Sequence, residues 1–321
     1  MTSSPQQPEG LVLCGLNGSN PLAFLAALGT LRTLSLAWPD RQVKMAWTRS
    51  AGAWRPVVQA SPTFDEEKTI ESLDGRLKTM TKHLALSLGD NLNMPFGDFR
   101  KHAIECVGQA TPQDRIAADF AAAFACDAIC DVQDKTGQKI QDTALRTMSG
   151  AGHQHFIASM RYIIEQTTAD HLRRALFAPW GYDDPVARLT LRWDPADDSR
   201  YALQWRDPSG DPSRKASGGM LGANRLAIEG LPMLVCAPRE NHLHTTGFVG
   251  RGSRDTFWTW PIWVAPACLG VCRSLLAMPS PQAFDAETAR QFREVGVAAV
   301  FRSQRITVGK FRNFTPATAV L

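Results

Sequence analysis

Apolar and polar positions follow two different periods along this chain, and the changes of period divide it into parts. Residues 11–16 form a short apolar run, which predicts a buried strand. Residues 21–38 are apolar almost all round, which is typical of a central helix, and Asn20 precedes them as a natural N-cap. Residues 41–60 alternate on either side of a Gly-containing turn and predict two paired strands.

Helical periodicity dominates the middle of the chain, and strand character returns after Asp184. Helices are predicted at 65–88, 111–130 and 153–177. Residues 187–194 and 200–207 predict a hairpin around a polar turn. The other elements expected are a helix within 218–234, strands at 242–250 and 256–264, helices at 266–278 and 286–296, and paired strands at 297–314.

These elements together predict an α+β fold. A strand-bearing N-terminal piece, residues 11–63, and a β-rich C-terminal half, residues 181–321, are expected to form one mixed lobe. A helical block, residues 64–180, is inserted between them. Residues 1–10 are rich in Ser, Pro and Gln and are expected to be a flexible tail.

The composition is that of a globular protein. The 321 residues are 44% hydrophobic and 21% charged, which is enough to bury a sizeable core. No apolar run approaches the roughly 18 residues that a membrane span needs. Residues 1–10 contain neither the basic region nor the apolar region of a secretory signal. These features predict a cytoplasmic protein that contacts no membrane and keeps its thiols reduced.

Seven cysteines include two pairs spaced i, i+4, which are Cys126 with Cys130 and Cys268 with Cys272. Four thiolates suit a zinc ion. Both pairs lie in apolar stretches that predict helices, and free cysteine is among the most buried residue types. We therefore expect core cysteines, no metal and no cofactor.

Histidine occurs twice in the pattern H-x-H, as His153 with His155 and as His242 with His244. On a strand these positions share one face, so the second pair fits metal ligands or an acid–base pair. His244 and Thr246 also match one half of the motif of two-histidine phosphoesterases, but no other histidine supplies the second half. Ordinary polar strand positions are expected, with catalysis as the alternative.

A Gly-rich segment, residues 218–225, precedes a predicted helix, and backbone amides at a helix start can hold phosphate. Its spacing matches neither a Walker A motif nor a dinucleotide fingerprint. Arg214, Lys215 and Arg225 flank it and favour an anion. A Gly-rich turn that binds no ligand is the other interpretation, and the segment 15–20 is interpreted as a packing turn.

The C-terminus is the strongest charge feature, because no acidic residue follows Glu294. Cations interleaved with aromatic rings on paired strands suit phosphate contacts and base stacking. The alternative is a solvated strand face with Phe on the core side. The candidate nucleic-acid-binding residues are Arg302, Arg305, Lys310, Arg312 and Phe311, accompanied by Phe301 and Phe314, with Arg251 and Arg254 of a Gly-rich loop as a second positive element.

Several segments resemble proteins encoded beside type I CRISPR systems, specifically subtype I-G, also called I-U. The resemblance rests on LNGSNPLAFLAALGTLRTL near the start, LRWDPADDSRYALQW, GANRLAIEGLPML, HLHTTGF, and VAAVFRSQRITVGKFRNFTPA at the end. It implies a non-enzymatic subunit of an RNA-guided surveillance complex in antiviral defence, in the place of a reduced large subunit. Its partners would be guide RNA, target DNA and the other subunits, with sequence read mainly by base pairing.

Two other classes of function stay open. One is an RNA-processing or phosphoesterase enzyme that uses His242 and His244. The other is a structural scaffold whose aromatic stretch FWTWPIW, residues 257–263, docks a protein partner, since Trp is enriched at binding hot spots.

Overall fold

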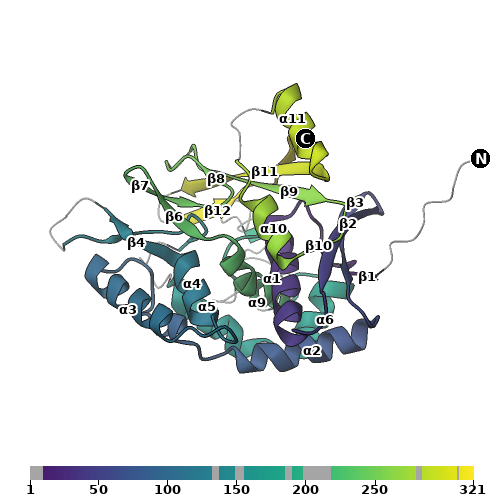
Figure 1. The fold of residues 1–321 in the computed structure, drawn as a ribbon, viewed down its shortest axis with the longest axis horizontal. Helices are drawn as coiled ribbons and strands as arrows, with labels where there is room; N and C mark the ends of the chain where they lie inside the picture. Colours follow the sequence, from purple (N-terminus) through teal and green to yellow (C-terminus); the bar gives the residue numbers. More distant parts are fainter. Residues whose placement is uncertain are drawn as a thin grey trace, which may run out of the picture.

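The fold is α+β, as predicted, with a helical layer beneath a sheet (Figure 1). The computed structural model describes residues 10–131, 137–148, 155–184, 190–197, 218–252, 254–279, 284–308 and 311–321. No helix in these ranges has both the length and the apolar character needed to cross a bilayer.

Two buried helices form the centre of the molecule, α1 (Pro21–Ala37) and α9 (Leu221–Gly230). The side-chain oxygen of Asn20 caps α1 by accepting a hydrogen bond from Ala23 N at 3.1 Å, as its position in the sequence predicts. Gly29 lets the two helix backbones touch, because a Cβ atom there would lie 1.7 Å from the carbonyl oxygen of Leu226. The two helices therefore form the rigid axis on which the sheets pack.

A four-stranded sheet packs beside α1 and contains strands from both the N-terminal piece and the C-terminal half. Its order is β1 (Leu11–Val12), β3 (Ala53–Gln59), β2 (Lys44–Ser50) and β10 (Ala267–Cys268), all antiparallel. The β2–β3 hairpin confirms the alternation at 41–60. Because β10 pairs with β2, the N-terminal piece and the C-terminal half share this sheet.

A second antiparallel sheet lies across the top of the molecule (Figure 1). It contains β12 (Phe311–Phe314), β11 (Val297–Val308), β9 (Phe257–Trp263) and β8 (Phe248–Val249), with β13 (Thr318–Ala319) pairing with β11. Trp258 and Trp260 of β9 are fully buried and contact Phe24 of α1. The aromatic stretch is therefore part of the core and is not available to dock a partner protein. On the other side, α11 (Ala286–Glu294) packs against β11.

The helical part contains α2 (Glu66–Thr79), η1 (Leu84–Ser87), α3 (Phe96–Gly108), α4 (Ile116–Phe124), α5 (Phe156–Gln166) and α6 (Ala169–Phe177). Two expectations here are wrong. The helix predicted at 65–88 ends at Thr79, and Leu84–Ser87 forms the separate short helix η1. The helix predicted to run to residue 130 ends at Phe124, and Ala125–Cys130 is strand β4, paired with β5 (Ile140–Asp142). Pairing with β5 and packing against the more distant strands β6 and β7 override the helical propensity of the Ala-rich segment.

The remaining elements are a small hairpin of β6 (Cys236–Arg239) and β7 (His242–Thr245), helix α10 (Leu269–Leu276), and the short helices η2 (Pro195–Asp197) and η3 (Leu231–Met233). The hairpin predicted at 187–194 and 200–207 lies largely outside the described residues. One continuous hydrophobic cluster includes both Phe99 and Phe156 of the predicted helical block and Phe24 and Trp260 of the predicted lobe.

Candidate anion-binding site

Three arginines converge where β11 and β12 meet the segment after β5. Arg305 of β11 and Arg312 of β12 lie on one face of the sheet, because Arg305 pairs with Phe314 and Thr307 pairs with Arg312. Arg146 follows β5 and belongs to a distant part of the sequence. Arg305 and Arg146 are only 8% and 9% exposed, so neither forms a solvated strand face.

The 142–148 segment holds all three guanidinium groups through hydrogen bonds to backbone oxygens. Nη1 of Arg305 donates to the carbonyl of Ala144 at 2.7 Å, and Nη1 of Arg146 donates to that of Met148 at 2.9 Å. Nη1 of Arg312 donates to the carbonyl of Arg146 at 3.3 Å. These bonds fix the arginines near one another, because each acceptor lies on the same short stretch of backbone.

Asp142 pairs directly with the cluster, with its Oδ2 2.8 Å from Nε of Arg146. The carboxylate of Asp255 also acts on Arg305, and that of Asp131 acts on Arg146. Burial and then repulsion from Arg312 lower the pKa of Arg305 to about 10. Burial and then Arg146 lower the pKa of Arg312. Nε of Arg305 is buried and donates to no acceptor among the described residues.

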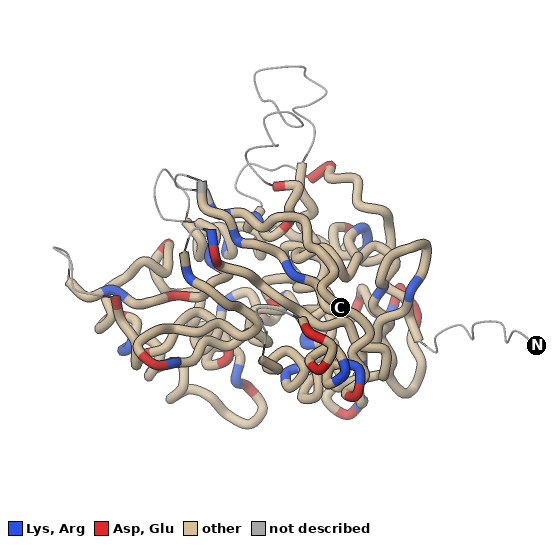
Figure 2. The backbone as a smooth tube through the Cα atoms, turned by 90° about the horizontal axis from the view of Figure 1, so that it is seen from above, with Lys and Arg blue, Asp and Glu red and all other residues tan. Residues whose placement is uncertain are grey.

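An exposed basic loop lies next to this cluster. It contains Arg251 and Arg254, the second positive element that the sequence suggested. Backbone N of Arg305 donates to the carbonyl of Thr256 at 2.8 Å, and the side chain of Gln304 donates to the carbonyl of Arg254. Arg251 and Arg254 are both exposed. Figure 2 views the molecule from above and shows Lys and Arg positions interspersed with Asp and Glu positions. The loop thus forms the outer part of one basic region.

The basic candidates of the C-terminus do not share one surface. Arg302 lies on the opposite face of β11 from Arg305, where its Nε donates to Oγ1 of Thr259 at 3.1 Å and its guanidinium lies over the ring of Phe284. Lys310 and the side chain of Phe311 lie outside the described residues. Phe314 is fully buried and Phe301 is half-buried. Phe314 therefore serves the core, as the alternative interpretation expected.

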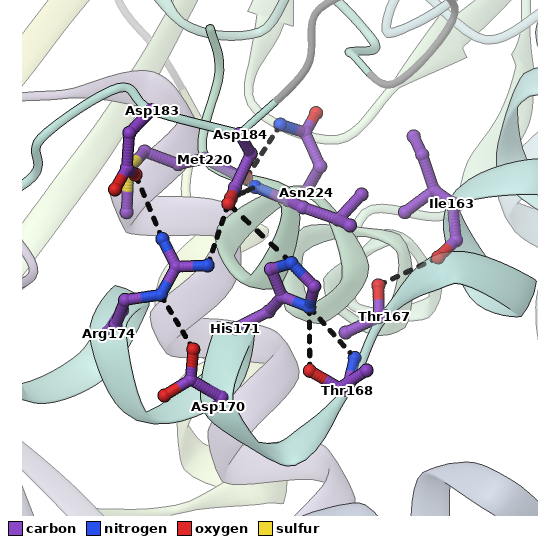
Figure 3. Close-up of polar contacts among 11 residues, drawn as sticks. Ile163, Thr167, Thr168, Asp170, His171, Arg174, Asp183, Asp184, Met220 and Asn224 are labelled. Carbon is purple, nitrogen blue, oxygen red and sulfur yellow. Dashed lines mark hydrogen bonds and ion pairs between the residues drawn. The ribbon is translucent and has the colours of Figure 1, made fainter.

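The Gly-rich segment before α9 serves an internal carboxylate. Oδ2 of Asp184 accepts a hydrogen bond from Leu221 N at 2.7 Å, which places a carboxylate where phosphate was considered. Figure 3 shows Asp184 between Arg174, whose Nη2 donates to it at 2.8 Å, and His171, whose Nε2 lies 3.6 Å away. The helix start is thus occupied from within the chain.

Arg225 lies in the core, where nucleic acid has no access to it. It is 1% exposed, and its Nη1 donates to Glu229 at 2.6 Å. The same carboxylate pairs with Arg32 of α1 at 2.8 Å. Charged pairs spaced i, i+4 are also typical of exposed helix surfaces, so only the packing of α1 on α9 reveals that this pair is buried. Arg214 and Lys215 lie outside the described residues.

His242 and His244 are adjacent on one face of β7, but few other reactive groups accompany them. Among the described residues, no group of three or more His, Cys, Asp and Glu side chains could hold a metal ion. The hydroxyl of Thr246 donates to the carbonyl of Val235 at 3.0 Å. Burial lowers the pKa of His244. His155 stands at the N-cap position of α5, but its side chain makes no capping hydrogen bond. His153 lies outside the described residues.

The sequence predicted four core cysteines on helices, and this prediction is wrong. Cys126 and Cys130 are half-buried on strand β4, and Cys268 is exposed at the start of α10. Cys272 is fully buried, and burial raises its pKa to about 12. The apolar composition of these stretches did not distinguish inward from outward positions.

No family model matches this chain, and no curated protein matches it in a sequence comparison.

Proposed function

We propose that this protein is a nucleic-acid-binding subunit with no active site of its own. The observation that carries the proposal is the cluster of Arg146, Arg305 and Arg312, in which three guanidinium groups lie together and Asp142 is the carboxylate that pairs with them directly. Like charges held together out of water raise the free energy of the folded protein. An anion bound at this cluster would lower it.

Phosphate is the anion that this arrangement suits best. The guanidinium group of arginine presents planar donors that match phosphate oxygens, and nucleic acids carry phosphate at every residue. Exposed Arg251 and Arg254 extend the basic region to the surface, where a phosphate backbone has access to them. The expected mode is contact with backbones, without reading of sequence.

The biological setting proposed is a type I CRISPR surveillance complex of subtype I-G in the cytoplasm. This part of the proposal rests on the resemblance of the sequence segments. In such a complex the guide RNA reads the target by base pairing, while protein subunits hold the backbones and the displaced strand. The partners would therefore be guide RNA, target DNA and the other subunits of the complex.

The test is the affinity of the purified protein for one single-stranded RNA, one single-stranded DNA and one duplex at several salt concentrations. We expect Arg251→Gln with Arg254→Gln to weaken binding for unrelated sequences. Each lost phosphate contact should flatten the log–log salt dependence by about 0.7 to 0.9 units. The matched control is Arg290→Gln, because Arg290 is also exposed but pairs with Glu287 and Glu294 on α11.

Two outcomes would contradict the proposal. One is unchanged affinity and salt slope in the double variant, in both the isolated protein and an assembled complex. The other is turnover of RNA or DNA that disappears in His244→Ala with folding intact, which would favour the phosphoesterase alternative.

A further inference from the structure

The arginine cluster is largely buried, in contrast to the loop beside it. Arg305 and Arg146 are nine-tenths buried, while Arg312 is half-buried and lies at the edge strand β12. A continuous phosphate backbone has neighbouring nucleotides on both sides of every phosphate, which hinders its approach to buried side chains. A strand end has a neighbour on one side only, so it meets less steric hindrance there.

The acceptors of a terminal phosphate also suit three guanidinium groups better than those of a backbone phosphate. Three guanidinium groups meet here, with Asp142 paired directly to Arg146 and with Asp255 and Asp131 acting on Arg305 and Arg146. A phosphodiester carries one negative charge. A terminal phosphomonoester carries close to two above its second pKa of about 6 and has three acceptor oxygens. The terminal group therefore offers the three guanidinium groups one more acceptor oxygen and a higher negative charge than a backbone phosphate.

The cluster further contains a donor without an acceptor. Nε of Arg305 is buried and has no hydrogen-bond partner among the described residues, although a buried unpaired donor is unfavourable. The Nη1 atoms of all three arginines are already used on backbone carbonyls, which holds the guanidinium groups in place before any ligand arrives. An oxygen of a bound phosphoryl group would satisfy the remaining donor.

We infer that the Arg146–Arg305–Arg312 cluster binds the terminal phosphomonoester of a nucleic-acid strand. This inference rests on the proposed function and adds a substrate class to it: strands that end in phosphate, held at their end by the largely buried cluster and along their backbone by the Arg251–Arg254 loop. The sources of the same chemistry are a 5′-phosphate, a 3′-phosphate and free inorganic phosphate, and the experiment separates them.

The experiment compares three oligonucleotides of one sequence, which carry a 5′-phosphate, a 3′-phosphate or hydroxyl groups at both ends. We expect the wild-type protein to bind one phosphorylated form about tenfold or more tightly than the hydroxyl form, as a charge-assisted hydrogen bond provides. Inorganic phosphate in excess should remove this preference. The preference for the phosphorylated oligonucleotide should also decrease below about pH 6, where the monoester becomes a monoanion while the arginines stay charged.

Two variants connect the preference to the cluster. Arg312→Gln should abolish the preference and keep the weaker binding of the hydroxyl form. Arg302→Gln is the matched control, because Arg302 lies on the opposite face of the same sheet. If Arg312→Gln does not fold, Arg312→Lys takes its place, and the pH profile of the wild type tests the inference without any variant.

The possible results separate the two proposals. Equal affinity for all three oligonucleotides would overturn the inference and leave the proposed function standing. A preference that persists in Arg312→Gln, or that does not change with pH, would assign it to another site and also overturn the inference. Absence of binding to every oligonucleotide would overturn the proposed function.

Discussion

Charged and titratable side chains in the interior each have a specific electrostatic environment. Burial alone would raise the pKa of Glu229, but Arg225 and Arg32 outweigh this effect and keep the pKa below its ordinary value. His83 lies next to this group and stacks on Phe120, with ring centroids 4.5 Å apart. Both of its ring nitrogens are buried without a hydrogen-bond partner in the described part of the chain. The ring is therefore held neutral.

The first residue-scale prediction is that His83 makes the protein less stable in mild acid. Burial lowers its pKa to about 4 from the ordinary 6.5. Its full contribution is present above pH 6.5 and is lost as the pH falls towards 4, because the unfolded chain takes up a proton that the folded protein resists. The loss should reach up to about 3 kcal/mol of unfolding free energy.

His83→Phe keeps the stacking on Phe120 and removes the titration, so urea unfolding of both proteins at pH 7 and pH 5 isolates the effect. Other groups cancel in this comparison, including Asp194, whose pKa burial raises to about 6. The same pH dependence in wild type and variant would show that His83 accepts a proton as easily in the folded protein as in the unfolded chain.

Close packing between elements depends on backbone contact at particular glycines. Gly29 of α1 touches the carbonyl of Leu226 in α9, and Gly230 approaches the carbonyl of Leu25 from the other side. Side chains at these positions would separate the two helices. The close approach also lets Arg32 of α1 reach Glu229 of α9. The central helix pair is thus specified by small residues as much as by apolar ones.

At this scale we predict opposite effects for two Gly→Ala substitutions in helices. Gly29→Ala should cost about 2 to 4 kcal/mol of unfolding free energy, because its Cβ overlaps the backbone of α9. Gly75→Ala in α2 meets nothing within 4 Å and should stabilise by about 0.5 to 1 kcal/mol through lower backbone entropy in the unfolded chain. Urea unfolding of both variants measures this. A loss below 1 kcal/mol at Gly29 would contradict the close approach.

The whole molecule is held together by contacts that cross the predicted domain boundaries. Phe156 of α5 contacts Trp193 edge to face, with centroids 6.2 Å apart. Arg32 of α1 lies over the ring of Phe120 of α4. Helix α1 also packs on α2, and α9 packs on α6. The division into lobe and helical block stays a prediction, but these contacts belong to one core.

We therefore predict that the two parts unfold in a single cooperative step. Eight of the nine tryptophans lie outside residues 64–180, so Trp fluorescence reports on the predicted lobe, while far-UV circular dichroism reports on all helices. The two transitions in urea should coincide, as two-state unfolding requires. A circular dichroism transition with a second step that fluorescence lacks would show that the helical block is an independent domain.

The local pattern of the sequence determined those elements in which apolar and polar residues follow one regular pattern from end to end. Helix α1 begins and ends within a residue of the apolar stretch that predicted it, and β2, β3, β9, β11 and β12 lie where alternation or apolar runs placed them. Caps, turns and periodicity are properties of neighbouring residues, so they are readable without the fold. The basic character of the C-terminal strands was readable for the same reason.

Only the tertiary structure decided which basic residues act together. Both faces of β11 are covered, so alternation could not show that Arg305 turns towards Arg146 while Arg302 turns towards Phe284. Arg146 joins the site from the middle of the chain, and no spacing in the sequence connects it to Arg305. In the same way, pairing with β5 made Ala125–Cys130 a strand, and Asp184 filled the start of α9. Each of these results depends on contacts between distant residues, which local composition does not encode.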